Sequence, residues 1–187
     1  MSVTLLDLHT ALIVIDLQKG VVSAPTVHPV GGIIQQAGTL AQAFRRAALP
    51  VVLVAVTGVP SGRTEQARSG GGPRPAGWAD IVPELNQQPT DHIVSKQTWG
   101  AFTRTDLEQH LKALSVTQVV LAGVATSVGV ESTARQAHEL GFNVTLVTDA
   151  MTDINSDAHF NSITRIFPKL GETGTTQEIM ALLAGRD

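Results

Sequence analysis

The sequence predicts one α/β domain, a three-layer sandwich in which a mostly parallel sheet carries helices on both faces. Short apolar runs rich in β-branched residues recur along the chain, as in strands buried on both faces of a parallel sheet. Amphipathic segments separate these runs, and alternating strands and helices form right-handed crossover units. The chain length of 187 residues fits a single domain over residues 1–187.

The expected strands are the apolar runs themselves, and the third is shorter and less apolar than the others. In chain order they are ALIVID (Ala11 to Asp16), PVVLVAV (Pro50 to Val56), HIVSK (His92 to Lys96), VTQVVLAG (Val116 to Gly123) and NVTLVTDA (Asn143 to Ala150).

Helices are expected where apolar residues recur with a helical period. They are Ile33 to Ala48, Asp106 to Leu114, Val130 to Leu140 and Thr176 to Leu183. Gly141 stands where a glycine would end the third helix, and the stretch 175–178 offers a capping side chain for the last one.

A long segment from Pro60 to Trp78 is rich in glycine and proline and has no periodicity. It predicts a loop after the second strand. A loop of this length in a compact domain is typical of a lid or a binding loop, although a solvated excursion is favoured for the tip, Ser69 to Pro75.

Composition excludes several function classes. The net charge is -3 and the 13 Lys and Arg residues are scattered, so no basic patch for nucleic acid is expected. No apolar run approaches the roughly 20 residues that span a bilayer, and no basic residue precedes the first apolar stretch, so a cytoplasmic protein without membrane contact is expected. The chain has no cysteine, which excludes disulfides, thiolate metal ligands and a cysteine nucleophile.

In open α/β sheets, ligands bind beyond the carboxyl ends of the strands. Asp16 and Lys96 are the acid and the base placed firmly at such ends. A buried carboxylate is costly unless it is hydrogen-bonded or functional, but Asp16 could also cap a turn through Gln18 or Lys19. Lys96 could set the protonation state of Asp16, or it could extend to the surface beside nearby aromatic residues.

The turn after the fourth strand reads GVATSVGVESTAR, and its backbone N–H groups would favour negative charge at the start of a helix. The other interpretation is a tight crossover that needs glycine for close packing. A serine hydrolase built on Ser127 is disfavoured because no Gly-x-Ser-x-Gly elbow is present. The six histidines show no metal-binding spacing, so neither a metal nor another cofactor is expected.

Several motifs in order resemble the isochorismatase-like hydrolases, also called the cysteine hydrolase superfamily. They are ALIVIDLQ, SKQTWGAFTRTDLEQHL, LAGVATSVGVESTARQAHELGFNVTLVTDAMTD and the closing IFPKLGETGTTQEIMALL, and together they run through almost the whole chain. The resemblance implies a parallel, Rossmann-like sheet of about six strands and a homodimer or homotetramer, with residues 149–168 as a candidate interface.

The resemblance also implies a catalytic trio. Asp16 matches the family's aspartate and Lys96 its lysine, whereas Gly129 stands at the position that holds cysteine in most branches. Thr57 to Pro60 replaces the acidic and histidine ligands of the nicotinamidase-type metal site. The isochorismatase branch likewise carries glycine for cysteine. Its reaction, hydrolysis of a vinyl ether, needs a general acid but no covalent nucleophile.

These matches lead to the expected function, a cofactor-free hydrolase of a small carboxylated substrate with Asp16 as general acid. Lys96 would orient Asp16, and Gly129 would leave room for substrate and water. The resemblance also implies a cis peptide bond without proline, between Val124 and Ala125. This bond would aim the backbone amides of residues 125–129 at the substrate. The expected substrate-binding residues are Gln18, Arg63, Arg68, Trp99, Phe102, Val124, Ala125, Thr126 and Ser127. Two alternatives stay open: a non-catalytic binder or scaffold, and an amide hydrolase that uses water.

Overall fold

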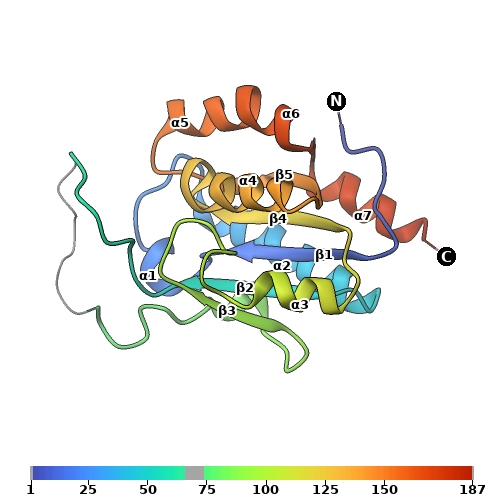
Figure 1. The fold of residues 1–187 in the computed structure, drawn as a ribbon, viewed down its shortest axis with the longest axis horizontal. Coiled ribbons are helices and arrows are strands. Elements are labelled where there is room, and N and C mark those ends of the chain that lie inside the picture. The colour runs from blue at the N-terminus through green and yellow to red at the C-terminus, as the bar shows by residue number, and fades with distance from the viewer. Residues whose placement is uncertain (1, 66–73, 187) are drawn as a thin grey trace.

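The computed structural model describes residues 2–65 and 74–186, and it forms one six-stranded parallel sheet (Figure 1). The strands are β1 (Thr10–Ile15), β2 (Val51–Val56), β3 (His92–Lys96), β4 (Gln118–Val124), β5 (Asn143–Thr152) and β6 (Glu172–Gly174). Their order across the sheet is β3-β2-β1-β4-β5-β6, and every neighbouring pair is parallel. The chain therefore reverses its direction of travel between β1 and β4, which is the position where such sheets bind ligands.

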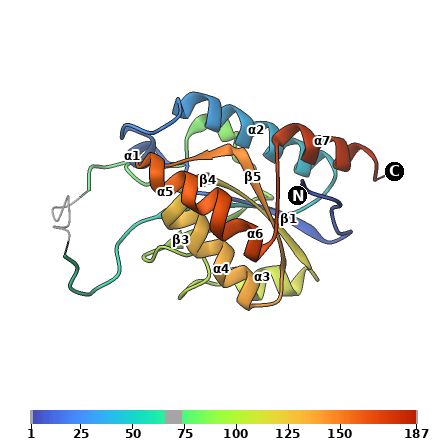
Figure 2. The ribbon, with the colours of Figure 1, turned by 90° about the horizontal axis from the view of Figure 1, so that it is seen from above.

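Helices cover both faces of the sheet, as the view from above shows (Figure 2). One face carries α2 (Val30–Arg46) and α7 (Thr176–Ala184), and the other carries α3 (Leu107–Ala113), α4 (Glu131–Glu139) and α6 (Phe167–Leu170). The expected three-layer α/β sandwich is confirmed.

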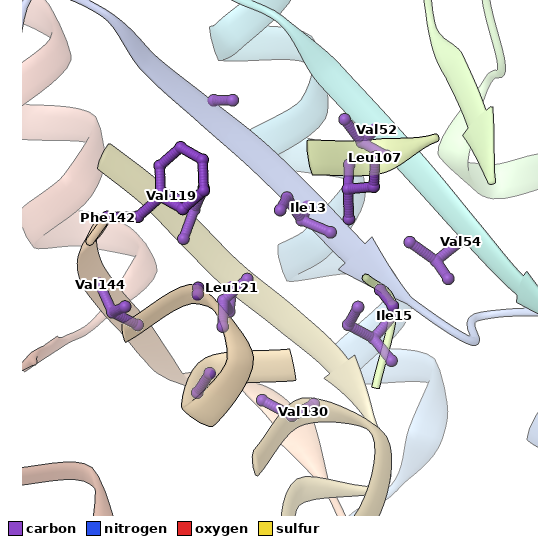
Figure 3. Packing of buried hydrophobic residues seen from close by; sticks show 14 of the residues in the cluster. Ile13, Ile15, Val52, Val54, Leu107, Val119, Leu121, Val130, Phe142 and Val144 are labelled. Atoms are coloured by element: carbon purple, nitrogen blue, oxygen red, sulfur yellow. The ribbon is translucent and has the colours of Figure 1, made fainter. Parts of the chain in front are cut away.

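Each face has its own hydrophobic core because successive strand residues point to opposite sides. Ile13 and Ile15 of β1 belong to the same core cluster as Leu107 of α3 and Val130, the residue directly before α4 (Figure 3). Leu12 and Val14 of the same strand pack under α2 and α7. All six residues of β1 are buried, which explains its continuous apolar sequence.

The remaining elements are short. They are α1 (Lys19–Val22), η1 (Pro83–Leu85), the π-helical turns η2 (Thr126–Val130) and η3 (Ser162–Ile166), and α5 (Ser156–Asn161). Of the expected helix signals, Gly141 has φ 86° just beyond α4, and Thr175 caps α7 in a capping box with Glu178. The expected helix from Val130 begins one residue later, because η2 occupies the preceding turn.

Two further observations complete the fold. The described parts of the expected loop, 60–65 and 74–78, contain neither helix nor strand, and its tip at 66–73 lies outside the described residues. In the described ranges, we find no helix of the length and apolarity that a bilayer crossing requires.

Candidate active site

An ion pair lies beyond the carboxyl ends of the central strands. Asp16 directly follows β1, and Lys96 is the last residue of β3. The Lys96 Nζ atom reaches across β2 to within 2.8 Å of Asp16 Oδ2, and it also donates to the backbone carbonyl of Trp99. Both side chains are almost fully enclosed, with exposed fractions of 1% for Lys96 and 9% for Asp16. The two residues that the sequence selected separately therefore form one buried unit.

The second carboxylate oxygen of Asp16 is different. Oδ1 is buried and has no hydrogen-bond partner among the described residues. A buried polar atom without a partner is costly, so such an atom is a candidate for interaction with a ligand. The Asp16 backbone also has φ 53°, a left-handed conformation that is uncommon for residues other than glycine and is found at functional sites.

The protonation of Asp16 follows from its surroundings. Burial raises the pKa of the Asp16 carboxyl to about 6, against the charge of Lys96, its hydrogen bond and the nearby Val56 backbone N–H, which lower it. The Val56 N–H donates its own hydrogen bond to the Gln18 side chain. The sequence could not show whether burial, which raises the pKa of Asp16, outweighs Lys96, which lowers it. In the structure the effect of burial is the larger. Asp16 can therefore hold or release a proton near neutral pH, as a general acid must.

The third member of the expected trio lies on the adjacent turn. Gly129 belongs to η2, which follows β4, and the peptide bond between Val124 and Ala125 is cis as expected. A Cβ atom built on Gly129 would lie 2.9 Å from Ile15 Cγ2 and 3.1 Å from Asp16 Oδ2. The glycine therefore lets the turn approach Asp16 closely. The space next to the Gly129 Cα is filled by atoms of Ile15 and Asp16. The sequence had instead led us to expect open room there for substrate and water.

Asp153 and His159, which were not among the expected site residues, hold this turn. Asp153 follows β5 and is fully buried, and its Oδ2 accepts a 2.6 Å hydrogen bond from the Ser127 amide. His159 of α5, also buried, has its Nδ1 2.8 Å from Thr126 Oγ1. The strand-end rule could have selected Asp153, because β5 ends at Thr152. The strand was instead expected to end at Ala150.

These contacts correct the expectation that every amide of 125–129 points at the substrate. The Ser127 amide is bound to Asp153, and the amides of Val128 and Val130 donate to the Ala125 carbonyl. Of the expected contact residues on the turn, Val124 and Thr126 are buried, whereas Ala125 and Ser127 are partly exposed.

Gln18 and Phe102, two of the expected substrate contacts, make contacts within the fold. The Gln18 side chain is fully buried, and its amide accepts from the Val56 N–H and donates to the Val56 carbonyl. It therefore ties the end of β1 to β2. Phe102 is 8% exposed, belongs to the core on the side of α4, and its ring stacks on Phe142 with 6.0 Å between the ring centroids.

Trp99 and Arg63 are exposed, and Arg68 lies outside the described residues. The structure thus brings together Asp16, Lys96 and the turn at Gly129, while the contact residues on the loops stay predictions. In the described part of the chain no three His, Asp or Glu side chains are grouped as metal ligands.

Comparisons with known proteins bear on the family and the fold of this chain. Residues 10–178 match the Isochorismatase domain model. The uncharacterized isochorismatase family protein YwoC of Bacillus subtilis is 38% identical over 177 residues, covering 91% of this chain and 92% of YwoC. Nicotinamidase 3 of Arabidopsis thaliana is 37% identical over 83 residues, 43% of this chain and 42% of that protein.

A solved structure shows the same architecture. The isochorismatase family protein BTH_II2229 of Burkholderia thailandensis superimposes with a TM-score of 0.86 at 40% identity, covering 98% of this chain and all of that one (100%). The family match, the relative and the fold agree over nearly the whole chain. The chain belongs to the isochorismatase family of hydrolases.

Proposed function

We propose that this protein hydrolyses a small carboxylated vinyl ether of the isochorismate type, without a covalent intermediate, and that Asp16 is its general acid. The observation that carries the proposal is the Asp16 carboxyl itself. One oxygen is held by Lys96, the other is buried without a partner among the described residues, and burial raises the pKa to about 6. A carboxyl in this state can deliver a proton from its free oxygen.

The reaction then proceeds in two stages. Asp16 gives its proton to the terminal methylene carbon of the vinyl ether, and the electron pair of the double bond forms the new C–H bond. The adjacent carbon becomes an oxocarbenium ion, which water attacks. The resulting hemiketal breaks its bond to the ether oxygen, which leaves as an alcohol, and pyruvate remains. The proton released from the added water restores the acid.

Lys96 and Gly129 have supporting roles in this scheme. The Lys96 ammonium holds Asp16 Oδ2, so that Oδ1 is the oxygen left for the substrate. It also balances the carboxylate that forms when the proton leaves. Gly129 permits the turn to lie against Asp16, and no cysteine nucleophile is required. The proposed substrate contacts are Arg63, Arg68, Trp99 and residues 124–127, because a guanidinium suits a carboxylate.

The test is release of pyruvate from isochorismate by the purified protein and by the Asp16→Asn variant. Wild-type protein should release pyruvate, and the variant should lose about 10²–10⁴-fold in kcat, the usual contribution of a general acid. The Lys19→Ala variant is a matched control, because Lys19 forms its ion pair with Asp80 at the surface. Turnover by Asp16→Asn at the wild-type rate would disprove the mechanism.

The pH dependence offers a second check. Because the active form of a general acid is the protonated one, kcat/KM should be constant below pH about 6 and fall tenfold per pH unit above it. A profile that rises through pH 6 would instead indicate that the carboxylate form of Asp16 acts, as a base. Steady-state rates from pH 5 to pH 9 distinguish the two.

An amide hydrolase that uses water is the second candidate. It is favoured by the partial match to a nicotinamidase and by the Asp16–Lys96 pair, which does not depend on the leaving group. Ammonia release from a panel of primary amides, with no pyruvate from isochorismate, would favour this candidate.

The remaining alternative is a non-catalytic binder or scaffold. Ligand-induced stabilisation by carboxylates or amides, without turnover of either class, would favour it.

We further propose a cytoplasmic homo-oligomer, dimer or tetramer, with residues 149–168 at the interface. Ile154 and Phe160 in this stretch are 69% and 54% exposed, which is unusual for large apolar side chains. Light scattering should give a dimeric or tetrameric mass for wild-type protein and a smaller mass for Phe160→Asp. A monomeric wild-type mass would contradict the proposal.

A further inference from the structure

A cavity of about 530 Å³ opens at the carboxyl end of β3, the edge strand of the sheet. It is lined by residues 59–61, 97–98 and 103–104 together with Ser95, and we call it the edge pocket. Its volume lies in the range of small-molecule sites. Neither Asp16, Lys96 nor Gly129 lines it, so the edge pocket is separate from the candidate active site.

The direction of the β3 side chains explains this separation. Side chains alternate along a strand. Lys96 points to Asp16, so its neighbour Ser95 faces the opposite side, where its hydroxyl lies 3.0 Å from Thr57 Oγ1. The Gln97 side chain packs beside Gly58, where a Cβ would lie 3.0 Å from Gln97 Cγ. The edge pocket thus occupies the space between the loop after β2 and the loop after β3.

The charge in the edge pocket is one-sided. Among the described residues that line it, Arg104 is the ionisable one and none is acidic. Within the described part of the chain, the Arg104 guanidinium makes no hydrogen bond or ion pair. A guanidinium binds a carboxylate through two parallel hydrogen bonds, and one guanidinium among the described lining residues matches a single negative charge.

The remaining lining is mostly neutral and polar, and it has one apolar part. Val59 and Pro60 form an apolar wall, and Val59 is 56% exposed. The neutral polar groups next to it come from Ser61, Ser95, Gln97, Thr98 and Thr103. A small organic acid has both properties, since its carboxylate suits Arg104 and its body suits the wall.

The backbone of Arg104 gives an independent observation. Its φ is 59°, in the left-handed region that suits glycine and that side chains such as arginine seldom adopt. Both neighbours are anchored, since Thr103 Oγ1 accepts from Gln136 and Thr105 Oγ1 donates to the Ala101 carbonyl. A strained residue at a cavity is typical of sites where function opposes stability.

We propose that the edge pocket binds a small organic carboxylate through the Arg104 guanidinium, at a site separate from Asp16. The ligand class is a monoanionic carboxylic acid with an apolar body. This proposal does not depend on which substrate, if any, the Asp16 site hydrolyses.

The test is calorimetric titration of the whole protein with benzoate, with the neutral isostere benzamide, and with inorganic phosphate. Benzoate should bind at least tenfold more tightly than benzamide or phosphate. Arg104→Ala and Arg104→Gly should each weaken benzoate binding at least tenfold, while Arg104→Lys should weaken it less. Arg165→Ala is the matched control, because Arg165 is an exposed arginine outside the pocket, and it should bind as wild type does.

The glycine variant separates binding from folding. Because glycine adopts φ 59° without strain, Arg104→Gly should melt no lower than wild type although it loses the ligand. Asp16→Asn and Arg63→Ala should retain benzoate binding. Equal binding of benzoate and benzamide, tighter binding of phosphate, unchanged binding by Arg104→Gly, loss of binding in Asp16→Asn, or no saturable binding by wild type would each overturn the proposal.

Discussion

The two ends of the sheet each bury a polar cluster, and the clusters differ in how fully their atoms are hydrogen-bonded. At the amino end, the Gln118 side chain of β4 accepts from the Asp7 amide and the Thr10 hydroxyl, and it donates to the Leu5 carbonyl and the Thr145 hydroxyl. At the carboxyl end, Asp16 binds Lys96 through one oxygen and leaves the other buried without a partner in the described part of the chain.

This difference separates a structural cluster from a functional one. A satisfied buried network fixes the register of the strands and has nothing left to offer a ligand. An unpartnered oxygen lowers stability, and it is retained where a substrate completes its interactions. We therefore expect the Gln118 cluster to raise the free energy of unfolding and the ionised Asp16 carboxylate to lower it. Removing the polar group should then destabilise the protein at Gln118 and stabilise it at Asp16.

The largest effect on stability is expected at the amino end. Gln118→Leu keeps the side-chain size but removes the partners of several buried groups, each worth about 1–3 kcal/mol, so a total loss of about 4 kcal/mol is expected. Chemical denaturation measures this loss. At a temperature where the variant is folded, its kcat should equal that of wild type. A large fall in kcat for folded Gln118→Leu would mean that the two ends are coupled.

Asp16→Asn should do the reverse and stabilise the fold. The folded-state pKa of Asp16 is raised from 3.8 to about 6, so the folded protein keeps a proton that the unfolded chain releases. This proton contributes stability below pH about 4, and the contribution is lost as pH rises through 6. The loss amounts to about 3 kcal/mol at pH 8. Asparagine cannot ionise, so the Asp16→Asn variant does not lose this stability as the pH rises.

The measurement is the free energy of unfolding of both proteins from pH 4 to pH 8. Their difference should be small near pH 4, grow by roughly 1.4 kcal/mol per pH unit, and level off above pH 6 in favour of Asp16→Asn. A difference that does not change with pH would mean that Asp16 is ionised throughout, and the comparison of the two ends would fail.

Some strands and site residues could be predicted from the sequence and others could not. Strands of continuous apolar residues were recognised because both their faces are buried, and the strand-end rule selected Asp16 and Lys96. β6 was not located because three residues, Glu172–Gly174, carry no apolar pattern. Asp153 was missed because the β4–β5 register shifts between Leu121 and Gly123, and β5 extends two residues beyond its apolar run.

Other features depend on contacts between distant residues, which a sequence pattern does not contain. The protonation of Asp16 depends on how deeply β2 and the turn at Gly129 bury it, against the attraction of Lys96. Phe102 looked like part of a site beside Trp99, but the path of the loop after β3 directs it into the core. Arg104 gave no signal because its left-handed backbone is set by the anchors on both sides.

The smallest effect concerns the fit of the turn against Asp16. In Gly129→Ala the new methyl group would meet Ile15 Cγ2 at 2.9 Å and Asp16 Oδ2 at 3.1 Å, so one of them must move. Overpacking of this kind costs about 1–3 kcal/mol. Displacing Asp16 should also lower kcat, because the acid must stay aligned with its substrate. Thermal melts and pyruvate release measure the two effects.

Gly31→Ala is the control for this substitution. Gly31 lies in α2, and a Cβ there would meet nothing within 4 Å, so alanine should stabilise the helix by about 0.5–1 kcal/mol. If Gly129→Ala behaved like Gly31→Ala, the turn would have freedom that the close contacts do not show. Asp16 would then owe its burial to β2 and Lys96 alone, and Gly129 would lose its place in the site. If only Gly129→Ala impairs stability and turnover, the close approach of the turn is itself a requirement for keeping Asp16 protonated and aligned.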